Sequence, residues 1–169
     1  MLAASISTAL EARGIGAVLS GGAAASIYSE GRYLSHDMDF VTVESLRVIE
    51  PVMDALGYRR TDGRHFESPE HEFLVEFVSG PLAFGDEDAL GEPASLRVGA
   101  ETLRIITPTQ SVMDRLAAYF HWSDPQALEQ ALLVAERHPV DVDQLRRWAR
   151  REGQAERFRH FADELAARR

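Results

Sequence analysis

One segment near the N-terminus constrains the fold more than any other part of the chain. A short apolar run at residues 15–19 leads into Gly21-Gly22, and a helix-forming stretch follows at residues 23–28. The next β-rich run begins at residue 37 and ends at residue 43. Because a glycine pair allows a sharp turn, this order predicts a strand, a tight turn, a helix and a second strand.

The second of these strands carries two carboxylates. Strand alternation places Asp37 and Asp39 on one face and Met38 and Phe40 on the other. Two such carboxylates lie about 7 Å apart, which suits a shared hard cation or two metal ions. The glycine turn and the helix start after it offer backbone N–H groups to phosphate oxygens. The alternative interpretation is a structural turn followed by an exposed acidic strand.

The remaining sequence predicts more strands and then only helices. We expect an α/β (α+β) fold with a small mixed sheet and flanking helices in residues 1–106, followed by a C-terminal helical region in residues 107–169. Residues 80–92 are predicted to form a loop. The other predicted strands are 58–60, 65–67, 72–78, 96–98 and 102–106, and the other predicted helices are 2–13, 44–56, 109–122, 125–137, 142–151 and 155–167.

Composition excludes several classes of chemistry. The chain has no cysteine, which excludes a disulfide framework, a thiolate metal site and a cysteine nucleophile. All of its Lys+Arg cations are arginines, so Schiff-base chemistry and a phosphate-loop lysine are excluded too. The net charge of −9 disfavours a large nucleic-acid surface. Without an apolar run of about 20 residues or a leader, we expect a cytoplasmic protein with no membrane partner.

The glycine turn followed by two acids resembles the nucleotidyltransferase superfamily built on the polymerase-β palm. That superfamily combines a Gly-[Gly/Ser] turn with a D-x-D motif on the next strand. The spacing here is most similar to the AbiEii-like abortive-infection and toxin branch, whose motif reads G-G-T-A-L and then S-x-D-x-D-F. The resemblance is specific over residues 15–43 and diffuse elsewhere. The matching positions are Gly21, Gly22, Ser35, Asp37, Asp39 and Phe40.

The resemblance implies a reaction and a set of catalytic acids. The reaction would be Mg²⁺-dependent transfer of a nucleoside monophosphate from a nucleoside triphosphate, such as ATP, to an acceptor hydroxyl. Asp37 and Asp39 would hold two Mg²⁺ ions together with a third carboxylate on a neighbouring strand. Glu76 fits that position, and Glu72 is its rival because it shares the same strand face. Either glutamate could instead be an ordinary solvated strand residue.

The resemblance also implies a nucleotide-binding set, from which this chain departs at three positions. Ala23 stands where the family often has Ser or Thr, Ser20 stands where the branch commonly has a basic residue, and Arg115 stands where the branch has Lys. An arginine can bind a triphosphate at least as well as a lysine. The expected nucleotide-binding residues are Ser20, Gly21, Gly22, Ser26, Ser35 and Arg115.

The sequence leaves three hypotheses about function open. The first is an active enzyme whose acceptor is a tRNA end, a protein or a small molecule. The second is a catalytically weak or inactive nucleotidyltransferase-like protein in a toxin–antitoxin or phage-defence system, with a cognate antitoxin as partner. The third is an interaction domain whose arginine-rich helical tail binds a neighbouring protein. The sequence leaves the base of the nucleotide and the oligomeric state undetermined.

Overall fold

The computed structural model describes residues 1–85, 87–88 and 91–168. It confirms the expected α/β class, with a seven-stranded mixed sheet and a helical C-terminal part. The strand order in the sheet is β3-β4-β5-β2-β1-β9-β8. The strands of this sheet are β1 (Val18–Ser20), β2 (Asp37–Thr42), β3 (Arg59–Asp62), β4 (His65–Ser68), β5 (His71–Ser79), β8 (Ala94–Val98) and β9 (Glu101–Ile105).

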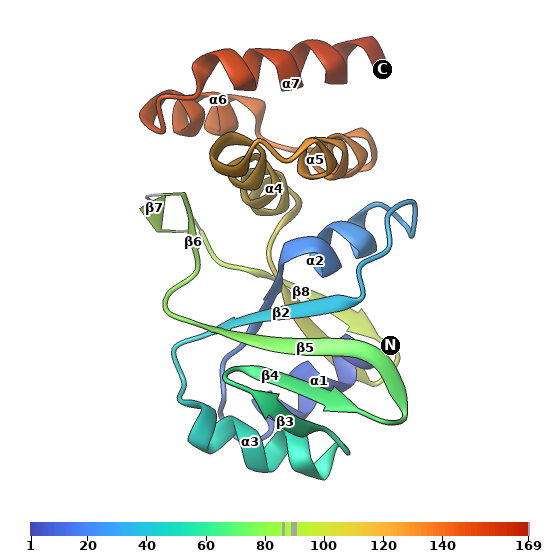
Figure 1. Cartoon of the computed structure of the whole chain (residues 1–169). Coiled ribbons are helices and arrows are strands. Elements are labelled where there is room, and N and C mark those ends of the chain that lie inside the picture. The colour runs from blue at the N-terminus through green and yellow to red at the C-terminus, as the bar shows by residue number, and fades with distance from the viewer. Residues whose placement is uncertain (86, 89–90, 169) are drawn as a thin grey trace.

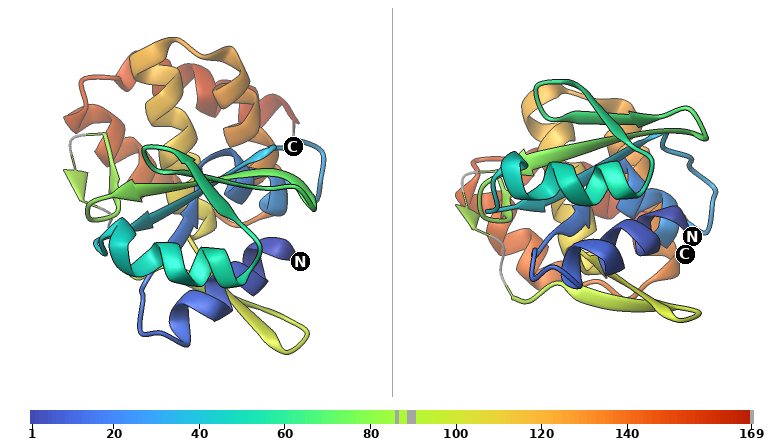
Figure 2. Two further views of the ribbon diagram at one scale, coloured as in Figure 1. Left: turned by 60° about the horizontal axis from the view of Figure 1, so that its bottom comes forward. Right: turned by 90° about the horizontal axis from the view of Figure 1, so that it is seen from below.

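Helices lie on both sides of this sheet. Figure 1 shows α1 and α3 below the sheet and α2 above it, with the C-terminal helices stacked above α2. The two views of Figure 2 show the same layering from below, with α1 and α3 side by side against the strands. None of the helices described is long and apolar enough to cross a membrane. The helices are α1 (Leu2–Glu11), α2 (Gly21–Tyr28), α3 (Leu46–Ala55), α4 (Pro108–Trp122), α5 (Pro125–Arg137), α6 (Val142–Arg151) and α7 (Ala155–Arg168).

Strand alternation decides which side chains reach the core. On β2, Met38 and Phe40 are buried, while Asp37 is exposed and Asp39 is half-buried. On β5, Val75 is fully buried between more exposed neighbours. The polar faces of both strands therefore stay available for chemistry, as the sequence pattern requires.

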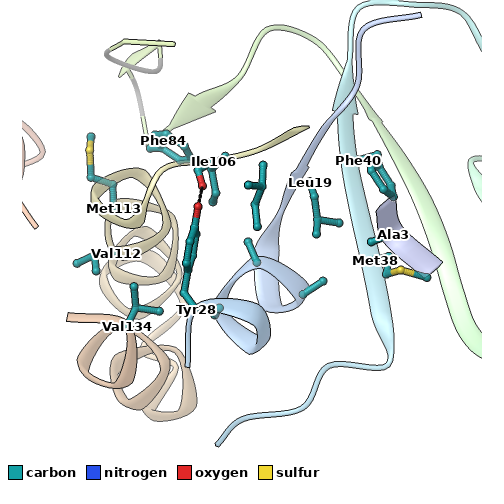
Figure 3. Packing of buried hydrophobic residues seen from close by; sticks show 14 of the residues in the cluster. Ala3, Leu19, Tyr28, Met38, Phe40, Phe84, Ile106, Val112, Met113 and Val134 are labelled. Carbon is teal, nitrogen blue, oxygen red and sulfur yellow. Dashed lines mark hydrogen bonds between the residues drawn. The ribbon is translucent and has the colours of Figure 1, made fainter. Parts of the chain in front are cut away.

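The helical region is joined to the sheet by one continuous apolar cluster. Its buried members come from both parts of the chain, including Leu19 on β1 and Val112 on α4. Tyr28, at the end of α2, donates a buried hydrogen bond of 2.7 Å to the carbonyl of Ile106 (Figure 3). The carbonyl of Tyr28 in turn lies 2.9 Å from Nε2 of His138. These contacts fix α2 between the sheet and the helices.

Three expected elements differ from the structure. The first strand runs over Val18–Ser20 rather than 15–19, and α2 begins at Gly21 rather than at residue 23, because the sharp turn is made at Gly21 itself, whose φ is +65°. The predicted loop 80–92 contains a two-stranded hairpin, β6 (Ala83–Phe84) and β7 (Glu87–Asp88). Phe84 anchors it, because its side chain is buried. Positions 86, 89 and 90 of that loop lie outside the described residues.

We predict that Tyr28→Phe destabilises the fold by about 1–3 kcal/mol, because it leaves the buried Ile106 carbonyl without its donor. Urea denaturation measures the loss. Tyr119→Phe is the matched control, because within the described part of the chain the Tyr119 hydroxyl has no hydrogen-bond partner. Equal stabilities of the two variants would contradict this role for Tyr28.

Candidate active site

The pairing of β2 with β5 brings the acids of two strands together. The strands run parallel, and Asp39 lies opposite Glu76 in the register. Paired residues of neighbouring strands project from the same face of a sheet, and Asp37 shares that face by alternation. The same register sets Asp37 opposite Leu74, so Glu72 lies beyond the paired part of β2. The structure thus places Glu76, and not its rival Glu72, beside the aspartate pair.

The glycine turn lies directly under one of these carboxylates. A Cβ added to Gly21 would overlap Oδ2 of Asp39 and would lie 3.2 Å from its Cγ. Gly21 also has a φ of +65°, which favours glycine. Both requirements, a left-handed backbone and an absent side chain, are met here by one residue. The turn between β1 and α2 is therefore built around the Asp39 carboxylate.

Negative charge is concentrated around Asp39. The pKa of this carboxyl is raised to about 6, first by burial and then by the nearby carboxylates of Glu76 and Asp114, against a lowering by Arg115. Within the described residues, the Asp39 carboxylate has no hydrogen bond or ion pair. An uncompensated acid among other acids is a typical binding position for a cation.

Glu76 is held by two basic residues in this structure. Its Oε1 forms an ion pair with Nε of Arg64, and its Oε2 lies 3.4 Å from Nε2 of His65. Arg64 follows the β3 strand and its side chain is 55% exposed, so it is free to move into solvent. Among the residues that the structure describes, no three His, Asp or Glu side chains are positioned to hold a metal ion as they stand.

Two of the expected nucleotide-binding serines form local hydrogen bonds. The hydroxyl of Ser20 donates to the carbonyl of Asp39 at 3.2 Å, which ties β1 to β2. The hydroxyl of Ser35 donates to the carbonyl of Asp37 at 3.0 Å. A Cβ on Gly22 would lie 3.0 Å from Ser35 Oγ, so the loop before β2 rests against the glycine turn. These contacts hold the turn and both aspartates in one rigid unit.

Ser26 lines a mostly apolar cavity with Met38 and Phe73, and Ser35 lines the same cavity. Met38 alternates with Asp39 along β2 and points to the other face. Ser26 was expected in the nucleotide-binding set, and among the described residues it shares this cavity with Ser35 and has no contact with the acids.

Arg115 reaches the acids from α4. Its Nη2 lies 2.6 Å from Oδ2 of Asp114, and its Nη1 donates to Oε1 of Gln130 at 3.2 Å. Its positive charge acts on Asp39, which places the guanidinium near the β2 acids. Arg115 is thus half of an ion pair at the site rather than a free cation.

Asp114 is the site residue that the sequence interpretation missed. One sequence pattern could have found it: residues 114, 118 and 122 are spaced four residues apart, which places them on one face of the predicted helix. Asp114, Arg115 and Trp122 line one cavity, whereas Leu116 and Phe120 face the core. The sequence does not tell which face of α4 meets the sheet. From the sequence alone, this polar face is therefore expected to be a solvated surface.

We predict that Gly21→Ala destabilises the protein more than Gly14→Ala. Both positions have a similar positive φ, +65° and +72°, so both substitutions carry the backbone strain of about 1–2 kcal/mol. Only the Gly21 substitution also collides with Asp39, because a Cβ on Gly14 would meet nothing within 4 Å. Urea denaturation measures the difference between the two variants. A Gly21→Ala loss no greater than that of Gly14→Ala would disprove the close approach.

We also predict that Asp39→Asn stabilises the metal-free protein near pH 7. Because the folded pKa of about 6 lies above the ordinary aspartate value of 3.8, the wild type loses stability as pH rises from about 4 to 6. The variant avoids this loss, which is at most about 3 kcal/mol. Denaturation at pH 3.5 and pH 7.5 should show a gain only at the higher pH. A gain of equal size at both values would contradict the raised pKa.

Comparison with known proteins bears on the fold. No family model and no curated protein matches the chain. Two solved structures of the aminoglycoside nucleotidyltransferase ANT(2″)-Ia are similar in fold. A crystal structure in complex with adenylyl-2″-tobramycin has 16% identity and a TM-score of 0.54 and covers 99% of this chain and 96% of that one. A solution structure of the same antibiotic-resistance factor has 17% identity, a TM-score of 0.54 and 92% coverage of each chain. The chain thus has the fold of a nucleotidyltransferase over nearly its whole length.

Proposed function

We propose that the protein is a nucleotidyltransferase that moves a nucleoside monophosphate from a triphosphate such as ATP to an acceptor hydroxyl. The observation that carries this proposal is the in-register pairing that sets Asp39 beside Glu76, with Asp37 on the same face and Gly21 beneath. The fold shared with ANT(2″)-Ia supports it. In the proposed division of labour, residues 1–106 hold the triphosphate and residues 107–169 complete the acceptor side.

The chemistry of the three acids fits a Mg²⁺ site, and the Glu76 carboxylate would have to leave Arg64 to join the two aspartates there. Carboxylate oxygens are the ligands that Mg²⁺ prefers, and the pKa of Asp39 is raised by burial and by the negative charge of Glu76 and Asp114, which a cation would offset. The Glu76 carboxylate already attracts the cationic side chain of Arg64, which can withdraw into solvent. Two bound Mg²⁺ ions would lower the pKa of the acceptor hydroxyl and offset charge on the leaving group.

The start of α2 would bind the triphosphate. Ser20 is the residue before the helix, and within the described chain no side chain caps the first N–H groups of α2. Such N–H groups, at the positive end of the helix dipole, bind phosphate oxygens. Gly21 and Gly22 let a phosphate approach the backbone, and Arg115 adds positive charge from α4.

The reaction then balances with residues present in the chain. The acceptor oxygen forms a bond to the α-phosphorus, and the bond from that phosphorus to the bridging β-oxygen breaks, releasing pyrophosphate. The hydroxyl proton passes to the Glu76 carboxylate once Arg64 has withdrawn, and from there to water. Positioning and electrostatics provide most of the catalysis in such transfers.

We further propose a small molecule as the acceptor. The ANT(2″)-Ia crystal structure contains an adenylylated small molecule, adenylyl-2″-tobramycin. The net charge of −9 and the acids of the site oppose a long phosphodiester chain. The proposal keeps the cytoplasmic location that the composition indicates and a kinship with the AbiEii-like branch.

A second candidate function is a nucleotide-binding partner protein without turnover, paired with a cognate antitoxin. The pairing of Glu76 with Arg64 and His65 favours it, because a Glu76 that stays bound there cannot join the aspartates. Ala23, which lacks the hydroxyl common at that position in the family, points the same way. Triphosphate binding without pyrophosphate release would favour this second candidate.

The first candidate predicts pyrophosphate release when the protein is mixed with Mg²⁺, a labelled triphosphate and tobramycin. Asp39→Asn should lower kcat at least about 100-fold without loss of fold, and removal of Mg²⁺ with a chelator should abolish turnover. Asp62→Asn is the matched control, because Asp62 is an exposed acid of β3 outside the site. Turnover of Asp39→Asn at the wild-type rate would refute the assignment.

A further inference from the structure

A cavity of ≈ 430 Å³ opens along α4, and Asp114 and Arg115 are among the residues that line it. Two of its residues connect it to the proposed site, because the charges of Asp114 and Arg115 both act on Asp39. Its volume lies in the range of small-molecule pockets, about 300–1,000 Å³. Its main lining residues are Gly85, Asp114, Arg115, Ala118, His121 and Trp122.

Trp122 is the most unusual residue of this cavity. Its side chain is 82% exposed, the most of any large hydrophobic side chain described, whereas Trp148 is fully buried. The backbone around it is nevertheless fixed. Ser123 ends α4 in the left-handed conformation, and Arg157 donates to the carbonyl of Tyr119 at 2.8 Å and to the Ser123 hydroxyl at 3.0 Å. An exposed indole on a fixed helix end is a preformed stacking surface.

His121, the neighbour of Trp122, is oriented by the carboxylate of a buried acid. Its Nε2 lies 3.3 Å from Oε2 of Glu152, whose side chain is only 2% exposed. Glu152 itself packs on Gly85, where an added Cβ would lie 2.6 Å from its Cδ. A carboxylate that orients one ring nitrogen leaves Nδ1 of His121 for a ligand. The imidazole is therefore positioned before any ligand arrives.

The charges of the cavity select the kind of ligand. Asp114 and Arg115 neutralise each other through their 2.6 Å ion pair, and His121 is matched by Glu152. A wall of balanced charges with one exposed indole suits a polar ring that also has an apolar face. A phosphodiester chain would bring further negative charge toward the acids of β2, which lie outside this balanced wall.

We propose that this cavity is the acceptor subsite and that it takes a free, hydroxylated ring compound. The ring stacks its apolar face on Trp122, and one of its hydroxyls hydrogen-bonds to His121. The nucleophilic hydroxyl then points toward Asp39 and Glu76. This inference rests on the proposed function and identifies the class of acceptor and the side chains that choose it.

Acrylamide quenching of tryptophan fluorescence tests the subsite without any turnover. Quenching reports mainly on Trp122, because Trp148 is buried. The probes are tobramycin, sucrose and the RNA trinucleotide CpCpA. We expect at least one of the two ring compounds to shield Trp122 from acrylamide and CpCpA to leave it accessible. Shielding by CpCpA alone, or by none of the three, would overturn the proposal.

The second experiment measures steady-state kinetics with the ring compound that shields Trp122 from acrylamide. Trp122→Ala should raise the KM for that compound at least tenfold while the Kd for the triphosphate stays unchanged, and Trp122→Phe should recover part of the loss. Val48→Ala, an exposed apolar residue of α3, is the matched control and should behave as the wild type. An unchanged KM in Trp122→Ala would overturn the subsite. If the wild type releases no pyrophosphate, the proposed function fails, and the quenching result still decides which ligand the cavity takes.

Discussion

The parallel pairing of β2 with β5 is the constraint on which the rest of the site depends. A shift of that register by one residue would turn Glu76 away from Asp39 and toward the core. The pairing concentrates acids at one place, and the pKa of Asp39 is raised by its burial and then by the repulsion from Glu76. A chain selected only for stability would avoid this arrangement, which is why we interpret it as functional.

The helical region packs onto the part of the chain that carries the candidate site. Tyr28 ties α2 to the segment that begins α4, and the apolar cluster continues from the sheet into the helices. α4 then brings Asp114 and Arg115 within electrostatic reach of Asp39. The nucleotide side and the acceptor side would therefore be held in one packed unit, with positions set by shared buried contacts instead of by a hinge.

Local features could be predicted from the sequence, and long-range contacts could not. The strand, glycine turn, helix and D-x-D strand depend on neighbours in the chain, and alternation was enough to put Glu76 on the polar face of its strand. The pairing of Glu76 with Arg64 and the burial of Glu152 behind His121 depend on tertiary packing, which periodicity does not specify. Ser26 was expected near phosphate because of its place in the motif, yet its position on α2 directs it to a different cavity.

The position of the Glu76 carboxylate in a nucleotide complex tests the account most directly. A crystal structure with Mg²⁺ and a non-hydrolysable ATP analogue would show it. We expect the carboxylate to have left Arg64 and to share metal ions with Asp37 and Asp39, with the triphosphate along the start of α2. A complex in which Glu76 still binds Arg64, and in which neither aspartate touches a metal ion, would contradict the account.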